Sequence, residues 1–198
     1  MKPLYIFDLD GTLALIEHRR HLINLQPGSP VLVKGDSAVY RGPNEKIEGD
    51  YWIDHGPGVG TYSWHPSDVK FKPDWSAFFA ACVDDKPNVP VVHVLHSLLY
   101  SAAEVRIFSG RSDEVREETV TWLTTHTNLR PRELLGPMLR MRKQGDYTPD
   151  EVLKKQWLDE LPTHDRMRLM CVFDDRDKVV KMWRDQGVAC FQVAPGEF

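Results

Sequence analysis

The sequence predicts a doubly wound α/β protein of Rossmann type with a mostly parallel sheet. First, four short apolar runs have continuously apolar interiors, which is typical of strands that helices cover on both faces. Second, helical patterns lie between these runs, so that strand and helix alternate along the chain. Third, three of the four runs end in reactive residue types, and open α/β sheets bind ligands at the carboxyl ends of their strands.

The elements follow from local patterns. The predicted strands are residues 4–10, 103–110, 168–175 and 188–194. Predicted helices lie in PDWSAFFAACVDD and VPVVHVLHSLLYSAA before the second strand, in SDEVREETVTWLTTHT after it, in TPDEVLKKQWLDEL and in RDKVVKMWRDQG. The fourth of these helices is expected to begin with Thr148 as its N-cap, in a capping box with Glu151. The last is expected to end at Gly187, since glycine is favoured just after a helix.

Residues 25–72 interrupt the alternation. This segment is rich in glycine, proline, aspartate and aromatic residues, and it holds β-like pieces such as PVLVKG and SAVYRG but no helical period. A stretch of this length within a compact domain is more often functional than idle. We therefore expect a core of residues 1–24 and 73–198 with an insertion at 25–72. Its aromatic residues either stack on a nucleobase or form a small core of the insertion; they are Tyr51, Trp52, Tyr62 and Trp64.

Composition places the chain among ordinary globular proteins and restricts its partners. Of its 198 residues, 41% are hydrophobic and 27% charged, and the net charge is −4, which offers no strong attraction to a long duplex. The three cysteines are scattered in apolar surroundings, as expected of reduced thiols in a cytoplasmic protein. The N-terminal MKPLYIFDLD has no signal-peptide h-region, and no window approaches the about 18 apolar residues of a membrane span. We therefore predict a cytoplasmic location and no membrane partner.

The three reactive strand ends carry four carboxylates. They read Asp8-Leu9-Asp10-Gly11-Thr12, Ser109-Gly110-Arg111 and Asp174-Asp175. Carboxylates gathered at one edge repel one another unless a cation lies among them or some are protonated. Ligands that are all oxygen suit a hard ion such as Mg²⁺, which usually keeps waters and takes a substrate phosphate oxygen. The sequence therefore predicts a magnesium site at this edge of the sheet.

The same edge is suited to phosphate chemistry. A hydroxyl at Ser109 and a planar guanidinium at Arg111 are common ligands of phosphate oxygens, and backbone N–H groups near Gly11 and Gly110 add to such a cradle. An aspartate in line with a bound phosphate can attack it, and a second acid can protonate the leaving oxygen. Asp8 and Asp10 suit this pair of roles, because residues i and i+2 of a strand face the same way.

The order of these motifs resembles a known family. FDLDGTLA, SGRSDEVREETVTWL, QGDYTPDEVLKKQW and FDDRDKVVKMWRDQGVACFQVAPGEF occur in sequence. Together they are similar to the haloacid dehalogenase (HAD) superfamily of Mg²⁺-dependent phosphotransferases, and within it to the 3′-phosphatase domain of phage-type polynucleotide kinase/phosphatase. The likeness covers residues 4–14 and about 103–198.

The resemblance implies a role for each motif residue. Asp8 would be the nucleophile, and Asp10 the general acid and base whose backbone carbonyl also ligates Mg²⁺. Lys154, rather than the adjacent Lys155, would neutralise the nucleophile and the phosphate. The resemblance places Ser109, Gly110, Arg111 and Thr12 at the substrate phosphate. It places Asp174 and Asp175 at the metal, without indicating which of the two binds the metal directly.

Two features separate the chain from the full phage-type enzyme. The pattern G-x-x-x-x-G-K-[ST] is absent, so no ATP-binding P-loop and no kinase activity are expected. The insertion also falls where the superfamily places a substrate-selecting flap or cap. The resemblance implies a phosphorylated nucleic-acid 3′ end as the substrate. The acidic net charge, the missing kinase half and the insertion favour the alternative, a free (deoxy)nucleoside monophosphate. A phospho-aspartate receiver and an inactive binding module are more distant alternatives, and nothing in the sequence indicates an oligomeric state.

Overall fold

The computed structural model describes residues 2–196, which divide into two compact units. The first unit takes in the chain up to Ile16 and again from Cys82 onward. The second comprises Glu17–Ala81. The insertion thus leaves the first unit soon after the first strand of its central sheet and returns to it before the second strand of that sheet.

A five-stranded sheet forms the centre of the first unit, in the order β10-β9-β1-β11-β12. Every neighbouring pair is parallel. The strands are β1 (Leu4–Phe7), β9 (Glu104–Ser112), β10 (Leu139–Arg142), β11 (Leu169–Arg176) and β12 (Cys190–Gly196). The mixed α/β class and the four predicted strands are confirmed. The edge strand β10 was not predicted, because its LRMR sequence is only four residues long and contains two arginines.

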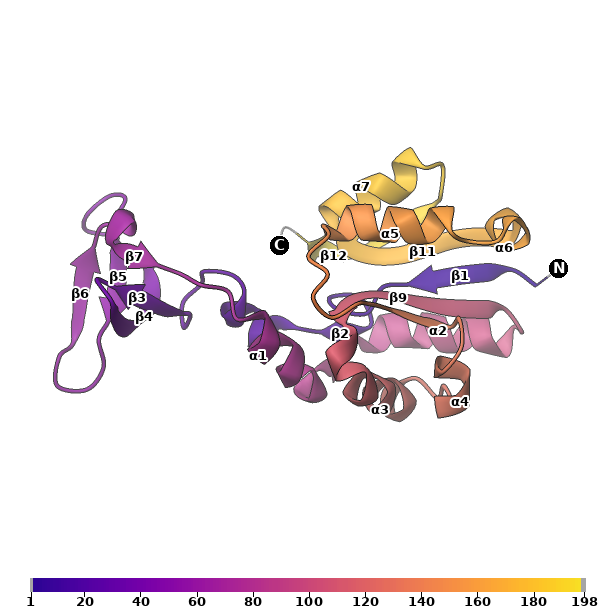
Figure 1. Cartoon of the computed structure of the whole chain (residues 1–198), viewed down its shortest axis with the longest axis horizontal. Coiled ribbons are helices and arrows are strands. Elements are labelled where there is room, and N and C mark those ends of the chain that lie inside the picture. Colours follow the sequence, from indigo (N-terminus) through magenta and orange to yellow (C-terminus); the bar gives the residue numbers. More distant parts are fainter. Residues whose placement is uncertain (1, 197–198) are drawn as a thin grey trace. The chain divides into compact units, whose positions relative to one another are not determined.

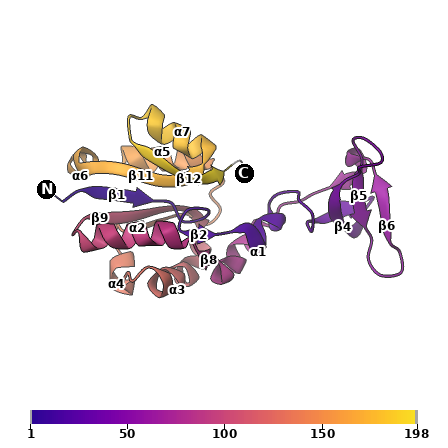
Figure 2. The same cartoon turned by 180° about the vertical axis from the view of Figure 1, so that it is seen from behind.

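Helices cover both faces of this sheet (Figures 1 and 2). On one face lie α2 (Val89–Tyr100), α3 (Arg116–His126) and α4 (Pro131–Leu134), and on the other α5 (Asp150–Asp159) and α7 (Asp177–Asp185). Shorter elements are β2 (Ala14–Leu15) paired with β8 (Lys86–Pro87), the 3-10 turns η3 (Ala81–Asp84) and η4 (Asp113–Val115), and α6 (Thr163–Arg168). The expected N-cap at Thr148 is wrong, since Pro149 is the N-cap of α5. Gly187 follows α7 with a φ of +75°, as expected.

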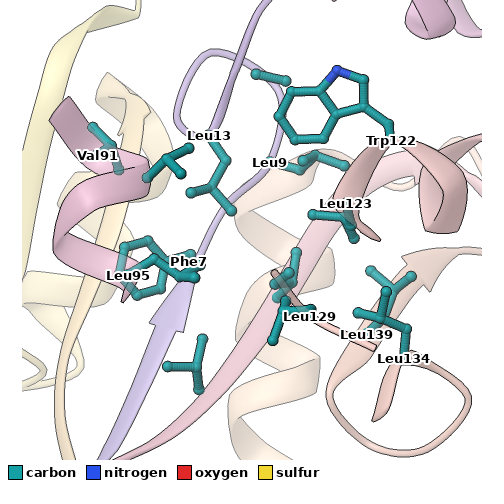
Figure 3. Close-up of a cluster of buried hydrophobic side chains, with 14 of the residues drawn as sticks. Phe7, Leu9, Leu13, Val91, Leu95, Trp122, Leu123, Leu129, Leu134 and Leu139 are labelled. Carbon is teal, nitrogen blue, oxygen red and sulfur yellow. The ribbon is translucent and has the colours of Figure 1, made fainter. Parts of the chain in front are cut away.

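Two apolar clusters fix these layers. The first lies between β1, β9 and the helices α2, α3 and α4, where Leu95 of α2 packs near Phe7 of β1 (Figure 3). The second joins β11 to α5 and α7 and includes the fully buried Trp183. Because β1 contributes to both clusters, through Phe7 and Ile6, both faces of the central strand are buried. This explains its continuously apolar sequence.

The second unit is an antiparallel sheet in the order β6-β5-β4-β3-β7. Its strands are β3 (Pro30–Val33), β4 (Asp36–Pro43), β5 (Tyr51–Asp54), β6 (Thr61–Trp64) and β7 (Val69–Lys70). The 3-10 turn η2 (Pro66–Asp68) lies between β6 and β7, the 3-10 turn η1 (Glu17–Leu22) precedes the strands, and α1 (Trp75–Ala80) follows them. Tyr51 and Trp64 pack against its apolar cluster, whereas Tyr62 is largely exposed. At least two of the four aromatic residues therefore serve as core.

This unit is wider than the segment 25–72. The guanidinium of Arg19 in η1 donates to the carbonyl of Phe78 in α1 at 2.9 Å and lies over the Phe78 ring at 4.1 Å. The backbone N–H of Asp74 also donates to the carbonyl of Leu22 at 2.8 Å. These bonds tie the two ends of the insertion together, so that η1 and α1 fold with it. Among residues 2–196, no helix has the length and apolar character that a membrane span requires.

Replacing Leu95 by alanine tests the packing in Figure 3. Leu95 is 0% exposed, so Leu95→Ala should lower the free energy of unfolding by about 3–5 kcal/mol through lost burial and a residual cavity. Denaturant titration measures this quantity. Leu135→Ala is the matched control: Leu135 is 76% exposed, and a change of less than about 0.5 kcal/mol is expected there. Equal losses for the two variants would contradict the assigned core.

Candidate active site

Three carboxylates converge at the carboxyl ends of two adjacent strands. Asp8 follows β1 directly, and Asp174 and Asp175 are in β11, the parallel neighbour of β1. One oxygen from each of the three carboxylates lies within 4.8 Å of the others. All three residues are buried. We refer to Asp8, Asp174 and Asp175 as the acidic triad.

Lys154 lies between two members of the acidic triad. Its Nζ donates to Oδ1 of Asp8 at 2.6 Å and to Oδ2 of Asp174 at 2.8 Å. The Lys154 side chain is 1% exposed, while that of Lys155 is 43% exposed and pairs with Asp159 on the same helix. Of the two adjacent lysines, Lys154 is the one that reaches the triad.

Burial and charge shift the pKa values of these groups. Burial raises the pKa of Asp8 well above its ordinary value, and the charges of Asp174 and Asp175 add to that shift against the opposing charge of Lys154. Burial and the charge of Asp174 raise the pKa of Asp175 to about 7. Burial alone would lower the pKa of Lys154, but the charges of Asp174 and Asp8 outweigh it and raise that pKa. One ammonium thus compensates three carboxylates incompletely.

This donor set fits a hard divalent cation. The triad offers oxygen ligands only, and two of its carboxyls have raised pKa values because negative charge is concentrated in a buried space. A cation such as Mg²⁺ would relieve that repulsion, and it is usually bound by one or two carboxylates together with waters. The expected metal residues Asp8, Asp174 and Asp175 therefore lie together. The Asp10 side chain does not belong to this cluster.

Asp10 instead belongs to a second charged group around Arg111. The guanidinium of Arg111 bonds the Asp10 carboxylate through Nη2 and through Nε, the latter at 3.3 Å. It also donates to Oδ2 of Asp85 at 2.8 Å and to Oγ1 of Thr119 at 3.2 Å. Burial alone would lower the pKa of Arg111, but the charge of Asp10 and the hydrogen bond to it raise that pKa overall. Arg111 therefore orients Asp10, which sequence reasoning did not foresee.

The remaining predicted residues lie beside the triad. Ser109 is fully buried in β9, next to β1, and its Oγ accepts the N–H of Arg111 at 3.2 Å. The hydroxyl of Thr12 donates to Oδ1 of Asp175 at 3.3 Å. Gly11 has a φ of +88°, and a Cβ at that position would lie 2.1 Å from Oδ2 of Asp175. Glycine is therefore required there by both backbone conformation and space.

The structure places Asp85, Arg142 and Asp150 near the site, and their roles were not predicted from the sequence. Asp85 pairs with Arg111, and its backbone carbonyl accepts the indole N–H of Trp122 at 2.7 Å. Asp150 pairs with both Arg142 and Arg176. One local feature of the sequence could have indicated the role of Asp150: it lies four residues before Lys154 and hence on the same face of the predicted helix. The Asp85–Arg111 and Asp150–Arg176 pairings each join residues 26 positions apart, whereas Arg142 and Asp150 are eight positions apart.

Comparisons with known proteins agree with this geometry. The family described as "Polynucleotide kinase PNKP phosphatase domain" matches residues 75–198. Two solved structures each match 100% of this chain at 24% sequence identity. The first is described as the Pnkp1/Rnl/Hen1 RNA repair complex; the match has a TM-score of 0.60 and covers 44% of that solved chain. The second is described as the Pnkp1/Rnl/Hen1 complex; the match has a TM-score of 0.62 and covers 47% of that solved chain. This likeness shows a shared fold. The chain spans less than half the length of those solved chains.

The raised pKa of Asp175 predicts a pH effect on stability without metal. Because this pKa is about 7 in the folded protein and ordinarily 3.8, the folded state binds a proton that the unfolded state releases between about pH 4 and 7. The free energy of unfolding should therefore fall as pH rises through this window. Asp175→Asn removes this proton and should lessen the decline. Denaturant titrations at pH 5, 6, 7 and 8 with a chelator measure both curves.

Parallel curves for the wild type and Asp175→Asn would contradict this account of the triad. Asp185→Asn is the matched control, since Asp185 is largely exposed and pairs with Lys181 on the surface of α7. Its pH dependence should follow that of the wild type.

Proposed function

The chain belongs to the family of polynucleotide kinase PNKP phosphatase domains, which are HAD-type phosphatases, and on this basis we propose that it removes the phosphate from a nucleic-acid 3′ end. The observation that carries the proposal is the position of Lys154 between Asp8 and Asp174 at the edge of a parallel sheet. The buried ammonium on one oxygen of Asp8 opposes the rise that burial gives the pKa of Asp8, and so favours its ionised form. An ionised carboxylate is what a nucleophile requires.

The substrate phosphate binds among Asp8, Ser109 and Lys154. Ser109 donates its hydroxyl hydrogen to a phosphate oxygen, while its Oγ keeps the Arg111 N–H that it accepts in this structure. The ammonium of Lys154 lowers the repulsion between the phosphate and Asp8. Asp8, Asp174 and Asp175, with the carbonyl of Asp10, would hold Mg²⁺, and the ion would neutralise phosphate charge.

Two displacements at phosphorus complete the reaction. A carboxylate oxygen of Asp8 attacks phosphorus and forms the aspartyl-phosphate, while the bond to the sugar oxygen breaks. Asp10, which enters this step in its protonated form, gives its proton to that oxygen. Asp10, now a carboxylate, then takes a proton from water as the water attacks the aspartyl-phosphate. Inorganic phosphate leaves, and Asp8 is restored as a carboxylate. Arg111 holds the Asp10 carboxyl in one orientation through both steps.

The unit Glu17–Ala81 is the substrate-selecting insertion in this proposal. It joins the first unit after β2, where the resemblance predicts a flap or cap. In the proposed division the catalytic core holds every residue of the acidic triad together with Lys154 and Ser109. The unit Glu17–Ala81, which has its own apolar core, then selects between a nucleic-acid end and a free nucleotide.

A role in the repair of nucleic-acid ends agrees with the family. The related solved chains are in Pnkp1/Rnl/Hen1 assemblies, one of which is described as an RNA repair complex. The net charge of −4 favours recognition of a chain end over a long phosphate track. The three described cysteines are free and buried, which supports the cytoplasmic location that we propose.

Replacing Asp8 by asparagine tests the nucleophile. The amide is similar in size but not nucleophilic, so Asp8→Asn should lower kcat by at least about 10³-fold. Initial rates on a 3′-phosphorylated oligonucleotide with Mg²⁺ measure this, and circular dichroism checks the fold. Asp185→Asn is the matched control and should retain wild-type rates. Near-normal activity of Asp8→Asn would rule out Asp8 as the nucleophile.

A substrate panel tests the specificity. The wild-type chain is assayed on a 3′-phosphorylated oligonucleotide, a 5′-phosphorylated oligonucleotide and 3′- and 5′-mononucleotides. We expect kcat/KM to be highest for the 3′-phosphorylated oligonucleotide, by about tenfold or more, since contacts to neighbouring nucleotides add binding energy. Higher kcat/KM for the mononucleotides would contradict the nucleic-acid end and identify a nucleotidase.

A further inference from the structure

The phosphate-binding segment 109–111 coincides with an irregularity in the sheet. Met141 of β10 pairs with Ser109, but the next residue, Arg142, pairs with Ser112. Gly110 and Arg111 are therefore extra residues on β9, and the ladder to β10 cannot satisfy their backbone groups in the regular way. Bulges of this kind occur next to active sites, where they redirect side chains.

The side chain of Arg142 supplies a hydrogen bond at the bulge, where the regular backbone pairing between β9 and β10 is interrupted. Its Nε donates to the carbonyl of Gly110 at 2.8 Å, and its Nη1 donates to the carbonyls of Thr148 and Asp146 at 2.6 and 3.2 Å. Its Nη2 bonds the carboxylate of Asp150. One guanidinium, 12% exposed, thus joins the bulge in β9 to the loop before α5 and to the first residue of that helix.

Asp150 holds Arg142 in this position and fills the space beside Gly110. A Cβ at Gly110 would lie 2.7 Å from Oδ1 of Asp150, so the carboxylate fits only because residue 110 has no side chain. Asp150 also pairs with Arg176 at the end of β11. Lys154 lies one turn further along α5 and bonds Asp8. The network therefore connects the phosphate-binding segment with the helix that carries the catalytic lysine.

We propose that Arg142 is a positioning residue for phosphate binding: it fixes the bulge at Gly110 relative to the start of α5, so that Ser109 and Lys154 present a phosphate site of constant geometry. The proposal rests on the proposed function, because it takes this segment as the place where the substrate phosphate binds. Arg142 itself donates to chain atoms in three directions, so its contribution acts through the residues it holds.

This role requires the guanidinium and not merely a positive charge. Nε, Nη1 and Nη2 point in fixed directions within one plane and reach Gly110, Thr148 and Asp150 at once. A lysine ammonium is a single point on a flexible stem and cannot span these three acceptors. Arg142→Lys keeps the charge and most of the apolar stem, so it separates positioning from electrostatics.

The test measures the affinity of the full 198-residue chain for inorganic phosphate with Mg²⁺, and its affinity for Mg²⁺ alone, by calorimetry. We expect Arg142→Ala and Arg142→Lys each to weaken phosphate binding by about tenfold or more. Mg²⁺ affinity should be unchanged, since Arg142 bonds no member of the acidic triad. Added guanidinium ion at millimolar concentration should partly restore phosphate binding to Arg142→Ala but not to Arg142→Lys.

Arg140→Ala is the matched control. Arg140 is on the same strand, is 36% exposed and pairs with Glu160, so its loss should leave both affinities at wild-type values. Wild-type phosphate affinity in Arg142→Ala, full restoration by Arg142→Lys, or a parallel loss of Mg²⁺ and phosphate affinity in Arg142→Lys would each overturn the proposal. Failure of the wild type itself to bind phosphate would instead contradict the proposed function.

Discussion

The candidate site depends on one buried ammonium placed between two buried carboxylates. Lys154 bonds Asp8 and Asp174 at 2.6 and 2.8 Å, and none of the three is appreciably exposed. Removing one partner of such a group leaves an uncompensated charge, which typically costs about 3–5 kcal/mol. The fold satisfies this constraint by placing β1 beside β11 and by beginning α5 at Asp150, so that Lys154 comes one turn later on the same face.

A second cation organises the other half of the site. Arg111 bonds Asp10 and Asp85, and Asp85 is in turn fixed because its carbonyl accepts the indole N–H of Trp122, a core residue of α3. Lysine and arginine therefore have separate tasks. Lys154 provides charge beside Asp8, the proposed nucleophile, while Arg111 provides a planar set of donors that hold Asp10, the proposed acid and base. Planar donors also explain why Arg142 is suited to the bulge at Gly110.

Sequence reasoning reached the architecture because apolar runs and helical periods are local properties. It recovered β1, β9, β11 and β12, together with the residues that converge on the triad. It missed β10, although Leu139 and Met141 alternate with two arginines as on an edge strand. It also missed the roles of Arg142 and Asp150, because each is a single charged residue outside any motif, although the two are only eight positions apart. It missed Asp85 because the role of that residue arises from pairing with Arg111, 26 positions away. The Arg111–Asp10 pair, |i−j| = 101, is of this kind.

The central claim is that Asp8 forms a covalent bond to the transferred phosphate. The direct measurement is acid quenching of the enzyme during turnover of a 3′-phosphorylated oligonucleotide that carries radiolabelled phosphate, followed by peptide mapping. The account predicts label on the peptide that contains Asp8, with release of that label by hydroxylamine and none in Asp8→Asn. Turnover without labelled enzyme, or label that persists in Asp8→Asn, would contradict it.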